Sequence, residues 1–136
     1  MKIVIADTDN NTVEDLFSLL KSPGQDWEIS SSNSGKQCLD ILKKNGCTDV
    51  VVLGRQLIDM PGLDLINKIR DDSDIPIVVL SNERNIDAMV SAFDAGANDY
   101  VTKPYNEQIF LARLKALIRR RAWDKQAREK KIANHT

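Results

Sequence analysis

Short apolar runs and helix-like segments alternate five times along this chain. The runs Asp49–Leu53 and Ile75–Ser81 are almost continuously apolar, which is typical of strands buried on both faces of a sheet. Between the runs, apolar residues recur at the three- and four-residue spacing of helices. Strands are predicted at Lys2–Ala6, Trp27–Ser31, Asp49–Leu53, Ile75–Ser81 and Tyr100–Val101. Helices are predicted at Asn11–Lys21, Gly35–Asn45, Leu63–Arg70, Ile86–Ala95 and from Glu107 onward.

This alternation favours an α/β fold with a parallel sheet and helices on both faces. Because crossovers between parallel strands are right-handed, few topologies remain, and a flavodoxin-like five-stranded order of 2-1-3-4-5 fits a chain of this size. Sites in such sheets form at the carboxyl ends of the strands, near strands one and three. The residues at these ends are Asp7, Thr8, Asp9, Gly54, Arg55, Ser81, Asn82 and Lys103.

The composition is that of one soluble globular domain. The chain has 136 residues, of which 42% are hydrophobic and 29% charged, and no apolar run approaches the roughly 18 residues of a membrane span. The first residues contain no apolar signal-peptide core, so we expect a cytosolic protein. Cys38 and Cys47 do not have a metal-ligand spacing and are expected to be free thiols.

Charge is distributed unevenly along the chain. The segment Arg119–Lys131 has seven basic and two acidic residues, a net charge of +5, whereas the whole chain has −1. A basic tail of this kind indicates either contact with nucleic acid or a solvated linker helix. We favour the linker, because the tail has a single aromatic residue, Trp123, and no recognition-helix pattern.

Five motifs occur in order along the chain, namely KIVIAD, TDVVVLG, MPGLDLINKIR, IPIVVLS and DAGANDYVTKP. Together they resemble the receiver domain of response regulators, which is CheY-like in fold. The last motif, followed by FLARLKALIRRR, is similar to OmpR/PhoB-type receivers, which a winged-helix DNA-binding domain usually follows. The resemblance covers residues 1–121, and we interpret residues 122–136 as a charged linker or helical tail.

The resemblance implies phosphoryl transfer onto an aspartate beside a magnesium ion, because a cation offsets the charge of clustered carboxylates and phosphoryl oxygens. In this chain the acceptor position is Gly54, which has no side chain. Asp7 stands at the first acidic position, but Thr8 replaces the second. By the same resemblance, Ser81 and Lys103 match the phosphoryl-contacting positions, Tyr100 matches the aromatic switch position, and Lys103–Pro104 resembles the family's cis-proline turn.

The pocket therefore looks degenerate. Asp9 could supply a lost carboxylate, but Arg55 adds a positive charge, so we expect neither magnesium nor another cofactor. Lys103 either retains an anion contact or neutralises Asp7 or Asp9, and we favour neutralisation. The combination of Thr8, Gly54 and Arg55 favours natural loss of the chemistry over an engineered change.

A substitute phosphoacceptor is conceivable at Asp59, although a turn or helix cap is the simpler interpretation of this residue. OmpR/PhoB-type receivers dimerise through the fourth helix, fifth strand and fifth helix. Asp99 and Arg113 match one of their charged pairs, while Met89 and Ile109 stand where opposite charges are frequent. Apolar contact there would give a constitutive dimer; alternatively, Met89 is a core residue or a lone exposed one.

We thus expect a non-enzymatic regulatory module, namely a phosphorylation-independent receiver that forms a homodimer and belongs to a transcription regulator. Such a regulator would contact DNA through a separate C-terminal domain. A stand-alone protein-interaction adaptor is the alternative, and an ordinary receiver phosphorylated at another residue is a weaker one.

Overall fold

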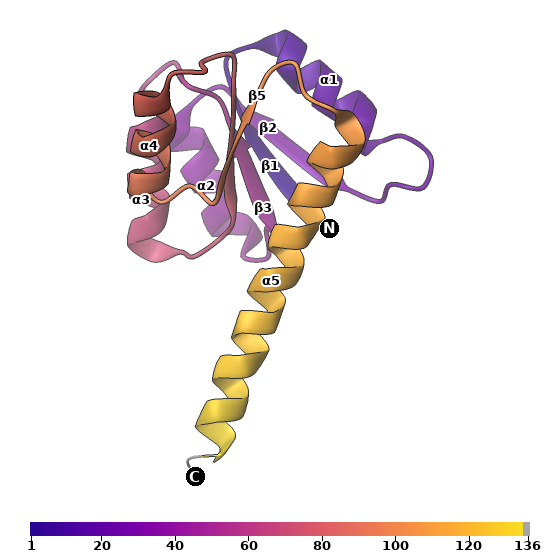
Figure 1. Cartoon of the computed structure of the whole chain (residues 1–136), viewed down its shortest axis with the longest axis vertical. Coiled ribbons are helices and arrows are strands. Elements are labelled where there is room, and N and C mark those ends of the chain that lie inside the picture. The colour runs from indigo at the N-terminus through magenta and orange to yellow at the C-terminus, as the bar shows by residue number, and fades with distance from the viewer. Residues whose placement is uncertain (135–136) are drawn as a thin grey trace.

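The computed structural model describes residues 1–134, in which five strands alternate with five helices (Figure 1). Of the predicted tail 122–136, His135 and Thr136 lie outside the described residues. The strands are β1 Lys2–Ala6, β2 Glu28–Ser32, β3 Val50–Leu53, β4 Ile77–Ser81 and β5 Asp99–Thr102. The helices are α1 Asn10–Leu20, α2 Gly35–Asn45, α3 Gly62–Asp72, α4 Ile86–Ala95 and α5 Glu107–Asn134.

All four strand pairings are parallel and the order is β2-β1-β3-β4-β5, which confirms the predicted flavodoxin-like topology. The central strand β3 explains the continuous apolar runs. Val51 and Leu53 pack into a core with α2, α3 and α4, whereas Val50 and Val52 pack into a second core with α1 and α5. Because both faces of β3 are covered, no position in the strand tolerates a polar residue facing water.

Element ends differ from the predicted ones by one or two residues. Trp27 was predicted to begin the second strand but precedes β2, and its side chain is fully buried in the core beside α1. Pro76 was predicted within the fourth strand but precedes β4. It has no N–H to donate to a neighbouring strand, yet its carbonyl still accepts a hydrogen bond of 2.9 Å from the Val51 N–H.

Both cysteines are free, as predicted: Cys38 is buried and Cys47 is exposed. Burial raises the pKa of the Cys38 thiol to about 12, so this side chain is a small apolar core residue at neutral pH. Within residues 1–134 there is no helix long and apolar enough to cross a bilayer.

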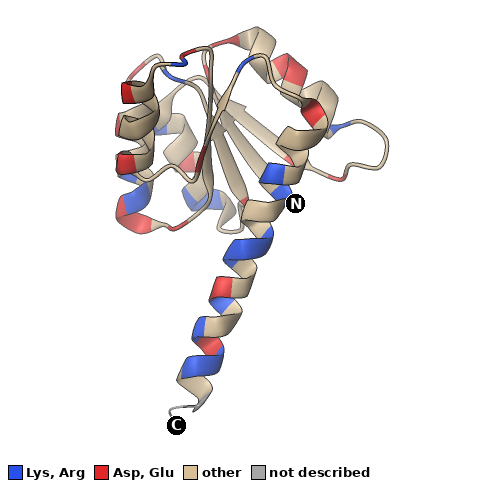
Figure 2. Ribbon diagram, viewed as in Figure 1, with Lys and Arg blue, Asp and Glu red and all other residues tan. Residues whose placement is uncertain are grey.

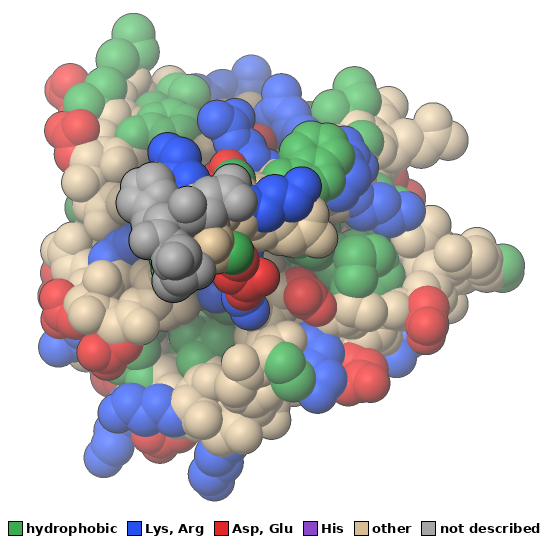
Figure 3. All heavy atoms as spheres, turned by 90° about the horizontal axis from the view of Figure 1, so that it is seen from below, with side chains coloured by type: hydrophobic (Ala, Val, Ile, Leu, Met, Phe, Trp, Pro, Cys, Tyr) green, Lys and Arg blue, Asp and Glu red, His purple; other side chains and the backbone are tan. Residues whose placement is uncertain are grey.

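Helix α5 continues without interruption across residues 121 and 122, from the globular body into the basic tail. Its 28 residues make it about 42 Å long at a rise of 1.5 Å per residue. The distal part of α5 projects from the body and carries more Lys and Arg than Asp and Glu (Figure 2). Seen from its free end, the helix projects from a surface with Lys and Arg side chains around it (Figure 3). The Arg119 guanidinium lies 5.9 Å from the Trp123 ring centroid on this projecting part.

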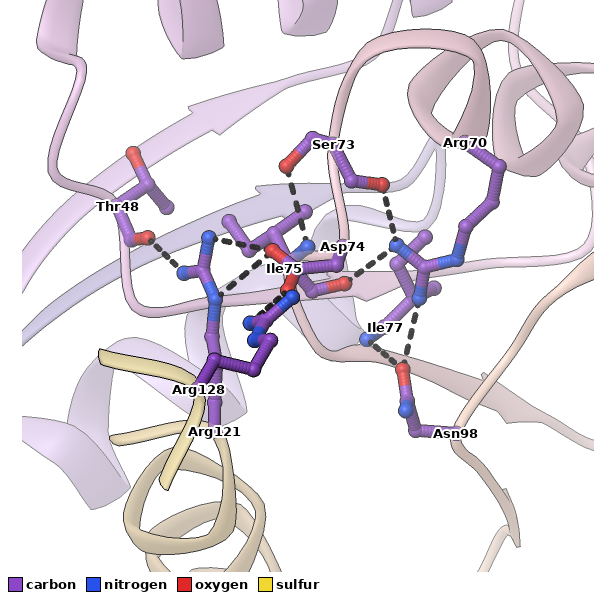
Figure 4. Close-up of polar contacts among 9 residues, drawn as sticks. All are labelled: Thr48, Arg70, Ser73, Asp74, Ile75, Ile77, Asn98, Arg121 and Arg128. Carbon is purple, nitrogen blue, oxygen red and sulfur yellow. Dashed lines mark hydrogen bonds and ion pairs between the residues drawn. The ribbon is translucent and has the colours of Figure 1, made fainter. Parts of the chain in front are cut away.

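A cluster of charged side chains connects α5 to the loop between α3 and β4 (Figure 4). Asp74, in the loop between α3 and β4, accepts hydrogen bonds from Arg121 at 3.0 and 3.2 Å and from Arg128 at 3.4 Å. Arg121 also donates to the carbonyl of Thr48 at 3.4 Å. Beside this cluster, Arg70 donates to the carbonyls that flank β4 and β5 and thereby holds the same loop in place.

Candidate functional site

Four strand ends meet at one edge of the sheet, as the topology predicts. Asp7 follows β1, Gly54 follows β3, Ser81 ends β4 and Lys103 follows β5. A cavity of about 290 Å³ opens there. Its walls include the predicted residues Asp7, Thr8, Arg55, Ser81, Asn82 and Lys103.

The closest approach at this edge is between Gly54 and Asp7. The Gly54 N–H donates a 2.8 Å hydrogen bond to the Ala6 carbonyl, which fixes the backbone just after β3. A Cβ atom on residue 54 would lie 2.5 to 2.6 Å from the carboxyl atoms of Asp7, closer than non-bonded atoms can approach. The Asp7 side chain, only 8% exposed, therefore occupies the space that any side chain at position 54 would enter.

Asp7 is held in this position by the backbone after β1. Its carboxyl oxygen accepts a 3.0 Å hydrogen bond from the Asp9 N–H. Burial raises the pKa of the Asp7 carboxyl, although that hydrogen bond and the charge of Lys103 act in the opposite direction. The site thus contains a carboxyl group whose ionisation is disfavoured by its surroundings.

Asp9 has a different task, because it caps the N-terminus of α1. Its carboxylate accepts hydrogen bonds from the Asn11 N–H at 3.0 Å and the Thr12 hydroxyl at 3.1 Å, and it pairs with Lys103 at 3.5 Å. Partial burial opposes ionisation, but these bonds and the Lys103 charge outweigh it and lower the pKa of Asp9. Lys103 also donates a hydrogen bond to Thr12. Its ammonium group is therefore paired with the Asp9 carboxylate rather than free.

The second basic side chain of the pocket is also paired. Arg55 lies 3.6 Å from the Glu83 carboxylate, and this exposed pair contributes little to stability. The Thr8 hydroxyl donates a 3.2 Å hydrogen bond to the carbonyl of Gln56. Thr8, which replaces the second acidic residue of the resemblance, therefore connects the loop after β1 to the loop after β3.

A magnesium ion requires near-octahedral oxygen coordination, and both carboxylates at this edge already have partners within the fold. Asp7 is buried with a raised pKa, and Asp9 is committed to the cap of α1 and to Lys103. Among residues 1–134, no three His, Cys, Asp or Glu side chains gather in an arrangement that could hold a metal.

Ser81 and Tyr100 both attach to the loop that follows β4. The Ser81 hydroxyl accepts a 3.0 Å hydrogen bond from the Glu83 N–H, and the Tyr100 hydroxyl donates a 2.8 Å hydrogen bond to the Glu83 carbonyl. Both side chains are buried. Tyr100 is therefore turned inward, and the loop between β4 and α4 is fixed from two sides.

Asp59 caps α2, which is the simpler of the two interpretations drawn from the sequence. Its carboxylate accepts hydrogen bonds from the N–H groups of Gly35 at 2.7 Å and Lys36 at 3.0 Å, and from the Ser34 hydroxyl at 3.1 Å. The backbone hydrogen bonds lower the pKa of this carboxyl.

The predicted dimer residues lie on α4, β5 and α5, and β5 lies between the two helices in Figure 1. Asp99 and Arg113 form an ion pair of 3.7 Å within the chain. Met89 is half-buried and packs against the core, whereas the Ile109 side chain is 56% exposed. The peptide bond between Lys103 and Pro104, just after β5, is cis.

The exposure of apolar side chains on α4 was not predicted from the sequence. Ile86, Val90 and Phe93 are 75%, 51% and 45% exposed. They produced the helical pattern of this segment, yet the residue that α4 buries is Ala92. The apolar spacing could have revealed the stripe only if the buried side of the helix had been known.

Comparison with known proteins agrees with this fold. The family model of the response regulator receiver domain matches residues 3–115. The cell cycle transcriptional regulator CtrA of Caulobacter vibrioides is 32% identical over 121 residues, which are 88% of this chain and 51% of CtrA. The transcriptional regulatory protein KdpE of Mycobacterium tuberculosis is 47% identical over 72 residues, 53% of this chain and 32% of KdpE. A two-component response regulator from Clostridium difficile superimposes with a TM-score of 0.80 at 29% identity, covering 88% of this chain and 97% of that one.

The chain therefore belongs to the response regulator receiver domain family. It spans about half the length of CtrA.

Proposed function

We propose that this chain is a receiver domain whose output does not depend on phosphorylation. The observation that carries the proposal is the contact between Gly54 and Asp7, because the acceptor position has no nucleophile and its space is filled by a neighbouring carboxyl group. The paired charges support the same view. Lys103 is neutralised by Asp9 and Arg55 by Glu83, so neither cation is free for an incoming phosphoryl group.

We also infer that the domain is non-enzymatic and needs no divalent cation. Phosphoryl transfer to a carboxylate relies on a metal or other cations to offset the charge of the transferred group. The acidic residues of the pocket are engaged in the fold instead, Asp7 through burial and Asp9 through its capping hydrogen bonds.

Incubation with acetyl phosphate and Mg²⁺, followed by intact-mass measurement, tests both statements. The expected result is an unchanged mass under conditions in which a receiver with aspartate at the acceptor position gains a phosphoryl group. An added phosphoryl group would overturn the proposal, and peptide mapping would then show whether Asp59 or another residue had accepted it.

We propose that the domain transmits its signal by forming a homodimer through the face of α4, β5 and α5. The apolar stripe of Ile86, Val90 and Phe93 on α4 and the exposed Ile109 on α5 support this proposal, because exposed apolar side chains favour association. An apolar contact persists without a chemical signal, whereas exposed ion pairs are weak and screened by salt. The dimer would therefore be constitutive.

Sedimentation velocity at tens of micromolar tests this assignment. A dimer that persists in high salt is expected, because salt screens charge but does not weaken apolar contact. A monomer under these conditions would remove the dimer from the proposal and favour the protein-interaction adaptor.

We further propose that the domain regulates transcription through a DNA-binding domain of the OmpR/PhoB type. The names of its relatives and their greater length support this, as does the continuous α5, which is suited to lead from the receiver to a second domain. The test is a winged-helix sequence after Thr136 in the complete gene, with DNA binding by the full-length protein that is unaffected by acetyl phosphate.

A further inference from the structure

A second cavity lies between α3 and α4, on the other side of Arg55 and Gln56 from the pocket at the strand ends. Its volume is about 380 Å³, which falls in the range of about 300 to 1,000 Å³ that is common for small-molecule sites. The floor is formed by Leu53, Ile66 and Val79, all of them buried.

The cavity is left open because the side of α4 that lines it carries mostly small side chains. Ala88, Ser91 and Ala92 line this side of the helix, so no bulky group from α4 fills the space above the apolar floor. The bulky residues of the helix, such as Val90 and Phe93, are exposed instead. An apolar floor of this kind favours the apolar part of a ligand, because binding removes both surfaces from water.

The rim determines the charge of a suitable ligand. Arg55 and Asp87 are the charged residues of the lining. Arg55 is paired with Glu83, whereas the Asp87 carboxylate has no hydrogen bond or ion pair within residues 1–134, and its backbone N–H donates to the Asn85 side chain. Asp87 lies in the first turn of α4, where the helix end carries about half a positive charge. This charge offsets part of the Asp87 charge, and the remaining negative charge lies at the rim.

We propose that the cavity between α3 and α4 binds a small apolar molecule that carries a cationic amine. The apolar part packs on Leu53, Ile66 and Val79, and the ammonium group lies at the rim beside Asp87. Such a ligand uses the two features that the cavity combines, a buried apolar floor and an unpaired carboxylate.

Tyr100 gives the site a connection to the proposed dimer face. Its ring lines this cavity and also a groove of about 190 Å³ that Ile109 and Arg113 border. A ligand that shifts Tyr100 in the cavity therefore changes a wall of the groove beside Ile109 and Arg113. This regulatory consequence rests on the proposed function, whereas binding itself does not.

The binding test uses phenethylamine, with phenylacetate and benzyl alcohol as anionic and neutral analogues. Methyl and aromatic resonances of the full chain are followed by NMR during each titration. Saturable shifts at Ile66, Val79 and Tyr100 are expected for phenethylamine, with a dissociation constant on the order of 1 mM for a fragment of this size. Absence of saturable shifts at these residues overturns the proposal, and so does equal or tighter binding of phenylacetate.

Variants of α4 locate the site. Ala88→Leu is expected to weaken phenethylamine binding about tenfold or more, because its added atoms occupy the cavity and close packing leaves no room for both. Ser91 also lines the cavity but is exposed, so Ser91→Leu provides the same test if Ala88→Leu does not fold. Ala116→Leu, which adds the same bulk at an exposed position of α5, leaves binding unchanged.

Asp87→Asn is expected to weaken phenethylamine binding about threefold, the size of an exposed ion pair, without affecting benzyl alcohol. Asp94→Asn, on an exposed position of α4 outside the lining, is the matched control. Unchanged affinity in Ala88→Leu or in Asp87→Asn overturns the site or its charge preference, respectively. The dimer dissociation constant measured with and without phenethylamine tests the link through Tyr100; an unchanged value overturns that link and leaves the binding result intact.

Discussion

The Asp7 carboxyl carbon lies 2.5 Å from the position that a Cβ atom on residue 54 would take. Glycine is thus required at position 54 as long as Asp7 keeps its buried conformation, and the two residues form one structural unit. Restoring a side chain at position 54 consequently needs more than a single substitution, because Asp7 has to rotate away and give up its hydrogen bond from Asp9.

Gly54→Ala is expected to destabilise the fold by about 1 to 3 kcal/mol, the usual cost of forcing extra atoms into a packed site. Asp7→Ala removes the obstructing carboxyl group, so adding Gly54→Ala to it is expected to cost much less. Chemical denaturation of the four proteins gives the coupling free energy, expected to be at least about 0.5 kcal/mol for residues in contact. Additive effects would mean that the two residues do not compete for the same space.

Asp7→Asn is expected to stabilise the protein at neutral pH. Burial raises the pKa of Asp7 above its usual 3.8, so folding favours the protonated form, and that stabilisation is lost as the pH rises through the folded pKa. Asparagine has no charge to desolvate and still offers an oxygen to the Asp9 N–H. The melting temperature of the variant should exceed that of the parent at pH 7, and the difference should vanish as the pH falls below the unfolded pKa.

Asp59→Asn provides the opposite control. The pKa of Asp59 is lowered by backbone hydrogen bonds from α2, so its contribution to stability is present above the unfolded pKa and is lost as the pH falls through the folded pKa. This variant should melt below the parent at neutral pH, and the two should converge in acid. A parallel response of both variants to pH would contradict the assigned environments.

The sheet order and the convergence of Asp7, Gly54, Ser81 and Lys103 could be predicted from sequence. Parallel strands bring their carboxyl ends to one edge whatever the side chains do. The contact between Asp7 and Gly54 could not, because it depends on the side-chain conformation that Asp7 adopts once the neighbouring position is vacant. The sequence places glycine at position 54 but does not say which group takes the space beside it.

Helix α4 shows a second limit. Periodicity identified the helix correctly, but its apolar residues occupy more than one side, and the pattern does not say which side the sheet covers. The outcome is that small Ala92 is buried while Ile86 and Phe93 are exposed. The contact of Asp74 with Arg121 and Arg128 of α5 could not be predicted from the sequence either. It joins residues that lie 47 and 54 positions apart.

Val90→Glu is expected to weaken the proposed dimer about tenfold or more, because it places a charge in an apolar interface where a central residue can contribute more than 1 kcal/mol. Ile132→Glu changes a comparably exposed apolar residue on the projecting part of α5 and should leave the dimer unchanged. Sedimentation equilibrium measures both dissociation constants. A larger effect of Ile132→Glu than of Val90→Glu would place the interface on α5 rather than on α4.

Asp74→Asn is expected to loosen the distal half of α5 without unfolding the domain. The carboxylate holds two arginines that lie two helical turns apart, and the amide cannot pair with both cations. Because these pairs are partly exposed, the loss of global stability should stay below about 1 kcal/mol. Hydrogen exchange at the amides of residues 118–128 should accelerate, while exchange in β3 and β4 stays the same.

Asp71→Asn, on an exposed position of α3 without these partners, is the matched control and should exchange like the parent. High salt should bring the parent closer to the Asp74→Asn variant, since it screens the same ion pairs. Unchanged exchange in the variant would show that packing of Leu117 and Ile118 against the body, rather than charge, sets the direction of α5.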